Sequence, residues 1–95
     1  MTTMTDFATL TDALLRRAFP AGLSQAEYLA TLRALAPHMS QRNLADVMSA
    51  FVRRDYSIVI NDVLGIYDAH LDADVLARVE SALERAGLAQ WLREA

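Results

Sequence analysis

Residues 19–37, FPAGLSQAEYLATLRALAP, contain a turn, a helix start, an amphipathic helix and a helix stop in one run. Ser24 is placed as the N-cap and Glu27 as its partner in a capping box, which satisfies two backbone N–H groups that the helix leaves free. Pro37 ends the helix because its ring and its missing N–H cannot continue an interior turn. The stretch therefore predicts one well-delimited helix, preceded by a turn at residues 19–22.

Four further segments have the apolar spacing of helices, at about residues 5–18, 40–53, 55–68 and 72–86. Ser40 and Asp72 are placed as the N-caps of two of them, and Gly87 suits the left-handed position after the last. Residues 55–68 also contain β-branched residues that favour a strand, but a lone strand would have no partner, so we choose a helix. We therefore expect an all-α fold, a compact bundle of about five helices that forms a single domain over residues 1–95.

The core is predicted from the larger apolar residues that recur on one face of each helix. They are Phe7, Leu14, Tyr28, Leu32, Leu44, Val47, Phe51, Val63, Val79 and Leu83. Trp91 and Leu92 follow the last long helix, and we expect them to fold the tail back onto the bundle. A chain of 95 residues can bury such a core and fold without a metal or a disulfide.

The composition excludes several classes of function. The chain has no cysteine, which rules out disulfides, thiolate metal sites and cysteine nucleophiles. Nine basic residues stand against twelve acidic ones, and the net charge of −3 disfavours nucleic acid as a partner, because binding it needs a concentrated basic surface. No run approaches the roughly 18 apolar residues of a membrane span, and the first ten residues lack the features of a signal peptide. We expect a soluble, unprocessed, cytoplasmic protein that takes no cofactor.

Residues in the turn, in the helix after it and in the last long helix carry a family resemblance. They are Phe19, Pro20, Ala21, Gly22, Leu23, Glu27, Tyr28 and Leu32, followed by Asp74, Val75, Arg78, Val79, Leu83, Ala86 and Gly87. This set resembles the small bacterial family, found mainly in mycobacteria and their relatives, that is catalogued as domain of unknown function 3349. Phe19 stands where that family usually has Tyr, and Ser24 where Pro is common. The resemblance implies a bundle of five helices and brings no established activity.

Four potential metal ligands stand at alternate positions, Asp68, His70, Asp72 and Asp74. The stretch is not an EF-hand, because Ala73 stands where the sharp turn needs Gly and Val79 where a bidentate Glu is needed. We interpret it as a polar loop that ends in a helix cap. A metal-binding or small-ligand-binding protein is the alternative interpretation.

The remaining polar residues form no catalytic motif. Neither His38 nor His70 has a companion nucleophile, and no Ser lies in a nucleophile elbow. Asn61 and Asp62 lie on an otherwise apolar helix and would suit a small polar ligand, although solvent exposure explains Asp62 as well. A buried carboxylate there would need an arginine as its partner. We expect no enzymatic activity.

Two arginine doublets, at 16–17 and 53–54, stand near predicted helix ends, where cations interact favourably with the helix dipole. Together with Arg33 and Arg42 they could also converge into a phosphate-binding patch. The helices on either side of Pro37 invite comparison with a helix-turn-helix, so a nucleic-acid-binding regulator is an alternative function. Only Arg42 supplies positive charge at the start of the would-be recognition helix, and the turn has no central Gly.

The apolar residues between positions 48 and 60 exceed what one face of a short helix can bury. An exposed remainder would form a surface for a protein partner or a homodimer, and complete burial inside the bundle is the alternative. We therefore predict a protein-binding or adaptor module. The residues predicted for its surface are Met48, Val52, Arg53, Arg54, Tyr56 and Val59.

Overall fold

The computed structural model describes residues 7–94, which form six α-helices and two short 3-10 helices. In chain order these are α1 (Phe7–Ala18), α2 (Gln25–Leu35), η1 (Ala36–His38), α3 (Gln41–Val52), α4 (Tyr56–Leu64), η2 (Ile66–Asp68), α5 (Ala73–Ala86) and α6 (Leu88–Glu94). Within this range there is no strand, so the predicted all-α bundle is confirmed. The predicted number of about five helices is corrected to six, because the tail after Gly87 forms a helix of its own.

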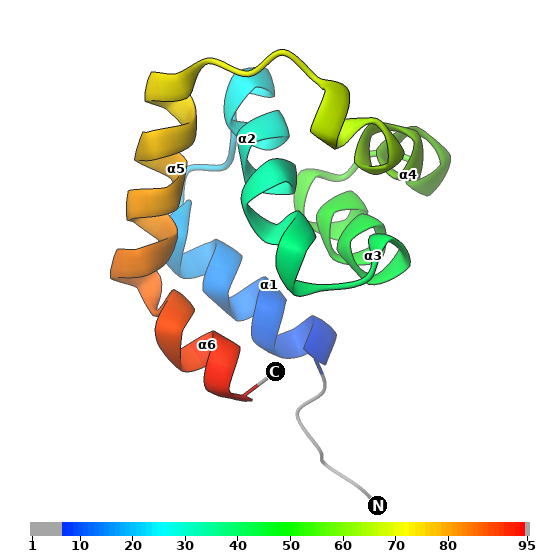
Figure 1. The fold of residues 1–95 in the computed structure, drawn as a ribbon. Coiled ribbons are helices and arrows are strands. Elements are labelled where there is room, and N and C mark those ends of the chain that lie inside the picture. The colour runs from blue at the N-terminus through cyan, green and yellow to red at the C-terminus, as the bar shows by residue number, and fades with distance from the viewer. Residues whose placement is uncertain (1–6, 95) are drawn as a thin grey trace, which may run out of the picture.

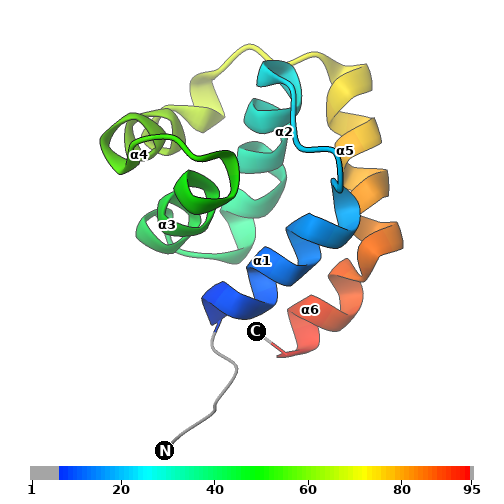
Figure 2. The same cartoon turned by 180° about the vertical axis from the view of Figure 1, so that it is seen from behind.

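The helices lie around α2 and α1 (Figure 1). Helix α5 packs beside α2 on one side of the molecule, and α3 and α4 pack against each other on the other side. Helix α1 crosses beneath them and contacts both α5 and α3, while α6 lies next to the crossing (Figure 2). Helix α1 therefore joins the two halves of the bundle.

The predicted helix starts are confirmed by their hydrogen bonds. The Ser24 N–H donates to Glu27 Oε1 at 2.8 Å and the Glu27 N–H donates to Ser24 Oγ at 3.2 Å, which completes the capping box. The backbone hydrogen bond from Ser24 lowers the pKa of Glu27, because it stabilises the ionised carboxylate. Ser40 caps α3 by accepting a hydrogen bond from the Asn43 N–H, and Asp72 caps α5 by accepting from the N–H groups of Asp74 and Val75, in both cases through the side chain of the N-cap residue alone. These caps are local, which is why the sequence alone placed them correctly.

The end of α5 is confirmed as well, and it is tied to the end of α1. Gly87 adopts the left-handed conformation at φ +113°, which suits glycine because it has no Cβ. Beside it, Arg17 Nε donates a hydrogen bond of 2.8 Å to the carbonyl oxygen of Ala86. This bond supplies a donor to a carbonyl that the end of α5 leaves without a helical partner.

Most of the predicted core is confirmed. Eight of the ten predicted residues are buried, while Phe7 and Phe51 are only half-buried, because Phe7 starts α1 and Phe51 lies near the open end of α3. The side chains that complete the buried cluster without having been predicted include Leu15, Leu35, Met48, Val59, Ile66 and Trp91.

Trp91 makes α6 part of the core. Its side chain is only 2% exposed, and its indole Nε1 donates a hydrogen bond of 3.0 Å to Thr11 Oγ1 on α1. The Thr11 hydroxyl in turn donates to the carbonyl oxygen of Phe7 at 2.7 Å, and the Phe7 ring lies 5.3 Å from the indole. The indole is thus both packed and hydrogen-bonded, as a buried tryptophan requires.

Trp91→Ala is expected to lower the free energy of unfolding by about 3–5 kcal/mol, because it leaves a cavity and removes the partner of Thr11. Leu92→Ala is the matched control on the same helix, since Leu92 is 44% exposed, and its expected loss is below about 1 kcal/mol. Urea denaturation followed by circular dichroism measures both. Equal midpoints for the two variants would contradict the packing of α6.

Candidate functional site

The structure divides the six residues predicted for a partner surface. Met48 and Val59 are fully buried, so the prediction that they belong to a surface is wrong. The reason is that α3 and α4 pack side by side and bury the faces that carry these two residues. The other four are accessible: Arg53 and Tyr56 are exposed, and Val52 and Arg54 are half-buried.

Val52 and Arg54 line a groove next to the turn between α1 and α2. Two adjoining hollows, of about 320 and 280 Å³, share Gly22 and Phe51 and so form one continuous depression. We call it the arginine groove, and its lining residues are Arg16, Phe19, Pro20, Ala21, Gly22, Leu23, Tyr28, Phe51, Val52 and Arg54. The turn that the sequence marks most clearly therefore forms one wall of a groove.

Gly22 shapes this wall through its backbone. Its φ of +88° lies in the region that residues with a side chain rarely adopt. A Cβ at this position would meet no atom within 4 Å, so the conformation, and not a lack of space, requires glycine here. The Gly22 N–H donates to the carbonyl oxygen of Phe19 at 3.0 Å, which closes the turn over the groove.

Arg54 is held in position at one end of the arginine groove. Its guanidinium lies 4.4 Å from the centre of the Tyr28 ring, and its Nη1 donates a hydrogen bond of 3.2 Å to Gln25 Oε1. A guanidinium that is stacked and bonded in this way loses little further freedom when it binds a carboxylate. Arg54 is therefore preorganised to bind an anionic group.

The ring of Tyr28, on which the guanidinium of Arg54 stacks, is itself held in place. The ring is almost fully buried, and its hydroxyl donates a hydrogen bond of 2.7 Å to Asp62 Oδ2 on α4. Burial raises the pKa of Tyr28, and the hydrogen bond to Asp62 raises it further, because both favour the neutral phenol. Asp62 is thus half-buried, where exposure was the favoured interpretation, and its partner is a tyrosine where the sequence suggested an arginine.

The structure brings only part of the predicted arginine patch together. Arg16, at the other end of the arginine groove, pairs with Asp12 at 2.7 Å. Arg17 bonds to the end of α5, and Arg33 stacks on the Tyr67 ring at 4.5 Å. One arginine of each doublet, Arg16 and Arg54, therefore reaches the same groove.

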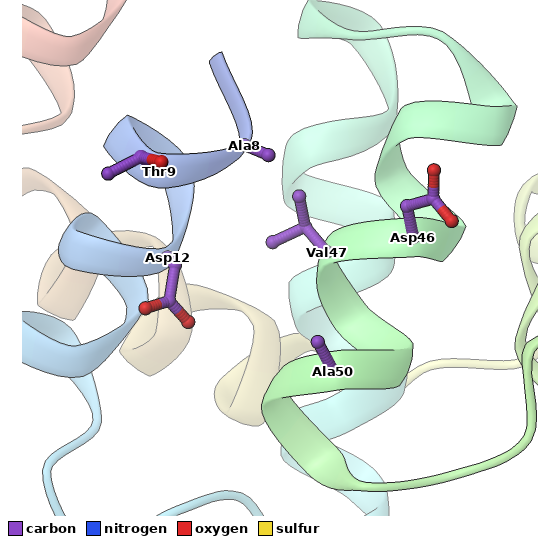
Figure 3. Close-up of a pocket in the computed structure, with 6 residues that line it drawn as sticks. All are labelled: Ala8, Thr9, Asp12, Asp46, Val47 and Ala50. Atoms are coloured by element: carbon purple, nitrogen blue, oxygen red, sulfur yellow. The ribbon is translucent and has the colours of Figure 1, made fainter. Parts of the chain in front are cut away.

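A second groove lies between α1 and α3, and the sequence had not indicated it (Figure 3). Two hollows of about 420 and 210 Å³ share Ala8, Asp46 and Val47. Ala8 of α1 and Val47 of α3 point toward each other across it in Figure 3. We call it the acidic groove, and its lining residues are Phe7, Ala8, Thr9, Asp12, Asn43, Asp46, Val47 and Ala50. Small and acidic residues scattered over two helices form no pattern in the sequence, so only the packing reveals it.

The outer face of α4 and η2 carries most of the large apolar side chains that remain exposed. Ile58 is 49% exposed, Leu64 59% and Tyr67 60%, although Arg33 covers one side of the Tyr67 ring. The apolar excess in this part of the chain is therefore divided: its inner side chains are buried and its outer ones face solvent.

The predicted alternatives for metal binding do not come together. Among residues 7–94, no group of three or more carboxylate and imidazole side chains lies close enough to hold a metal ion. Within the acidic stretch, Asp72 Oδ1 instead accepts hydrogen bonds from the N–H groups of Asp74 and Val75. His70 is exposed, and His38 lies at the edge of the Trp91 ring, 6.3 Å between ring centres.

Comparison with models of known protein families, with curated proteins and with solved structures gives no match for this chain. The resemblance to domain of unknown function 3349 therefore stays a prediction. In the described part of the chain, no helix has the length and apolar character needed to cross a bilayer.

Tyr28→Phe is expected to lower the free energy of unfolding by about 1–2 kcal/mol at pH 7, because Asp62 loses its buried donor. The raised pKa of Tyr28 also sets a pH dependence. The unfolded chain releases the phenol proton near pH 10, before the folded protein does, so wild-type stability falls as the pH rises above about 10. The Tyr28→Phe variant is expected to lose less over this range in urea titrations.

Tyr56→Phe serves as the control for this measurement, since the Tyr56 side chain is exposed. The free energy of unfolding of Tyr56→Phe should equal that of the wild type at neutral pH. It should also fall with rising pH in the alkaline range as steeply as that of the wild type. If Tyr28→Phe and Tyr56→Phe have the same alkaline slope, the hydroxyl of Tyr28 does not contribute in the way the structure indicates.

Arg53 ends α3 in the left-handed conformation, with φ +57° and ψ +55°, where a side chain costs roughly 1 kcal/mol. Arg53→Gly is expected to leave the melting temperature unchanged or to raise it, because the relieved strain offsets the added freedom of the unfolded chain. Arg53→Val should lower it, because a β-branched residue fits this conformation poorly. A Gly variant that melts well below the wild type would show that the Arg53 side chain stabilises the fold.

Proposed function

We propose that this chain is a protein-binding module without catalytic activity and that its partner occupies the arginine groove. The observation that carries the proposal is the continuity of this groove, which joins an apolar wall of Phe51 and Val52 to arginines at both ends. Aromatic and arginine side chains are the types that dominate the energy of protein interfaces. Two of the residues that the sequence predicted for a partner surface, Val52 and Arg54, lie in it.

The arrangement suits a polypeptide better than a small molecule. The residues that line the groove extend from Arg16 on α1 across the turn to Val52 and Arg54 at the end of α3, so the groove is elongated. A small-molecule site would enclose most of its ligand and place several polar groups at one point. Here the two cationic ends flank an apolar middle, which fits an apolar side chain with carboxylates on either side of it.

A homodimer through the outer face of α4 is the weaker alternative. That helix has nine residues and is therefore about 13 Å long. Two such faces bury much less than the roughly 1,200 Å² of a stable interface. We therefore propose that the partner is a different protein. The proposed binding site does not include Ile58 or Leu64.

A nucleic-acid-binding regulator is a second alternative, and it has less support than a protein-binding module. Helices α2 and α3 are joined by η1 as a helix-turn-helix comparison requires, but Asp46 stands on the exposed face of α3. A carboxylate there opposes the phosphate contacts on which such binding depends. The proposal also includes a cytoplasmic location, membership of the family that the sequence resembles, and no cofactor.

Ala21→Glu tests the proposed function, because it adds a carboxylate at an exposed position of the arginine groove. The matched control is Ala89→Glu, an exposed alanine on α6 outside both grooves. Affinity capture from extracts of the native cells, read by mass spectrometry, should recover a protein with the wild type and the control that Ala21→Glu loses. Circular dichroism establishes that both variants fold.

Recovery of the same proteins by all three forms, or of none, would overturn the proposal. Sedimentation of the purified chain accompanies the capture and is expected to show a monomer. Binding of random duplex DNA at low salt, weakening steeply as salt is added, would instead favour the nucleic-acid alternative.

A further inference from the structure

The arginine groove carries one positive charge that no carboxylate of the described chain neutralises. Arg16, at one end, already pairs with Asp12 at 2.7 Å. Arg54, at the other end, has no carboxylate within ion-pair distance in the part of the chain that the structure describes. Its guanidinium contacts the Tyr28 ring and the Gln25 amide oxygen instead. An anionic group is therefore attracted chiefly to the Arg54 end of the groove.

The guanidinium of Arg54 retains donors for such a group. A guanidinium carries several N–H donors in one plane, and the bond to Gln25 uses one of the two Nη groups. A guanidinium that stacks through its face can still bind a carboxylate through its edge, with two parallel hydrogen bonds. The stack on Tyr28 therefore fixes Arg54 without blocking the binding of a carboxylate.

The hollow around Arg54 is otherwise lined by uncharged residues. They are Ala21, Gly22, Leu23, Tyr28, Phe51 and Val52. The volume of about 280 Å³ lies just below the roughly 300–1,000 Å³ of small-molecule sites, so the hollow suits a single amino-acid residue. An apolar side chain that packs on Leu23 and Val52 is removed from water, which favours binding. The occupant that fits therefore brings one negative charge and one apolar group side by side.

The turn before α2 adds backbone donors to the same hollow. The N–H groups of Ala21 and Leu23 donate no hydrogen bond within the described residues, whereas the N–H of Gly22 between them closes the turn on Phe19. Backbone N–H groups in turns that contain a left-handed residue bind anions in many proteins, among them the carboxylates of chain ends. Main-chain donors and the cation of Arg54 therefore line one hollow.

The groove ends at Arg54. No lining residue lies beyond the stack of Arg54 on Tyr28, and on the other side the groove continues past Gly22 and Phe51 to Arg16. A polypeptide that enters from the Arg16 side and stops at the stack fits within this lining. The last residue of a chain also carries a carboxylate and a side chain on the same carbon atom. This is the combination of groups that the hollow around Arg54 accepts.

We propose that the arginine groove binds the C-terminal residues of a partner protein whose last side chain is apolar. The terminal carboxylate contacts Arg54, and the last side chain packs on Leu23 and Val52. The preceding residues lie over Phe51 toward Pro20. This inference rests on the proposed function and specifies which part of the partner binds.

Two matched peptide libraries test the proposal. Both contain the same short random sequences, with internal Asp and Glu included, and they differ only in having a free carboxylate or an amide at the C-terminus. The labelled wild-type chain is expected to bind peptides with a free carboxylate and an apolar last residue, and to bind their amides much more weakly. Equal binding to both libraries, which recognition of an internal Asp or Glu would give, overturns the proposal. The absence of any binder in the carboxylate library overturns it as well.

A charge removal then locates the carboxylate. The selected peptide is prepared as the free acid and as the amide, and each is measured by fluorescence anisotropy against the wild type, Arg54→Gln and Arg53→Gln. Arg53 is the matched control, because it is the neighbouring arginine, is exposed and lines neither hollow of the groove. Thermal melts establish that both variants fold.

Amidation of the peptide is expected to weaken its binding roughly tenfold with the wild type and with Arg53→Gln, because a charge-assisted hydrogen bond is lost. With Arg54→Gln the free acid should already bind about that weakly, and amidation should have little further effect, because the two changes remove the same contact. If amidation has the same effect on all three forms, the carboxylate lies elsewhere and the proposal is wrong.

The two proposals fail in different ways. If Ala21→Glu abolishes capture of the native partner but free acids and amides bind alike, the arginine groove binds a protein and the terminal carboxylate is wrong. If the carboxylate library binds as expected but capture fails for every form, the groove has this specificity and the proposed function loses its support.

Discussion

The position of Tyr28 is the constraint on which most of this structure depends. The ring is buried at the centre of the bundle, its hydroxyl bonds to Asp62 on α4, and its face supports the guanidinium of Arg54 beyond α3. Three elements that are distant in the sequence are therefore aligned by one side chain. A phenol can do this because it combines a large apolar body with a single donor at its tip.

The same contacts that stabilise the bundle also build the candidate site. Arg54 reaches the arginine groove only because Tyr28 and Gln25 hold it there, and Arg16 reaches the other end while paired with Asp12. Ion pairs and stacks near a surface contribute little to stability by themselves. Their main effect here is to fix the positions of two cations around an apolar groove, which lowers the entropic cost of binding.

At the end of α3, residues belong to the candidate site or lie beside it although their conformation and exposure do not favour stability. Arg53 adopts a left-handed backbone that glycine would adopt at lower cost, and its side chain is exposed. Phe51 and Val52, just before it, are only half-buried although they are large and apolar. This segment therefore departs from the rules that the rest of the chain obeys, and such departures are characteristic of functional segments.

The local part of the fold was predictable. The caps at Ser24, Ser40 and Asp72 and the left-handed Gly87 depend on neighbours within four residues, so the sequence shows them directly. Helix α6 was not predicted as a helix because a segment of seven residues is too short to show the apolar periodicity of a helix. Its position depends on the hydrogen bond from Trp91 to α1.

The sequence by itself determined the fold class, the starts of the helices and most of the core. The reason is that apolar periodicity and capping depend only on residues within one helix and next to its ends. Only the tertiary structure decided that Met48 and Val59 are buried and that Val52 and Arg54 line a groove. It also decided that Asp12 and Asp46, on different helices, line the acidic groove together. The reason is physical: periodicity shows that a helix has a face, whereas packing alone decides what that face meets.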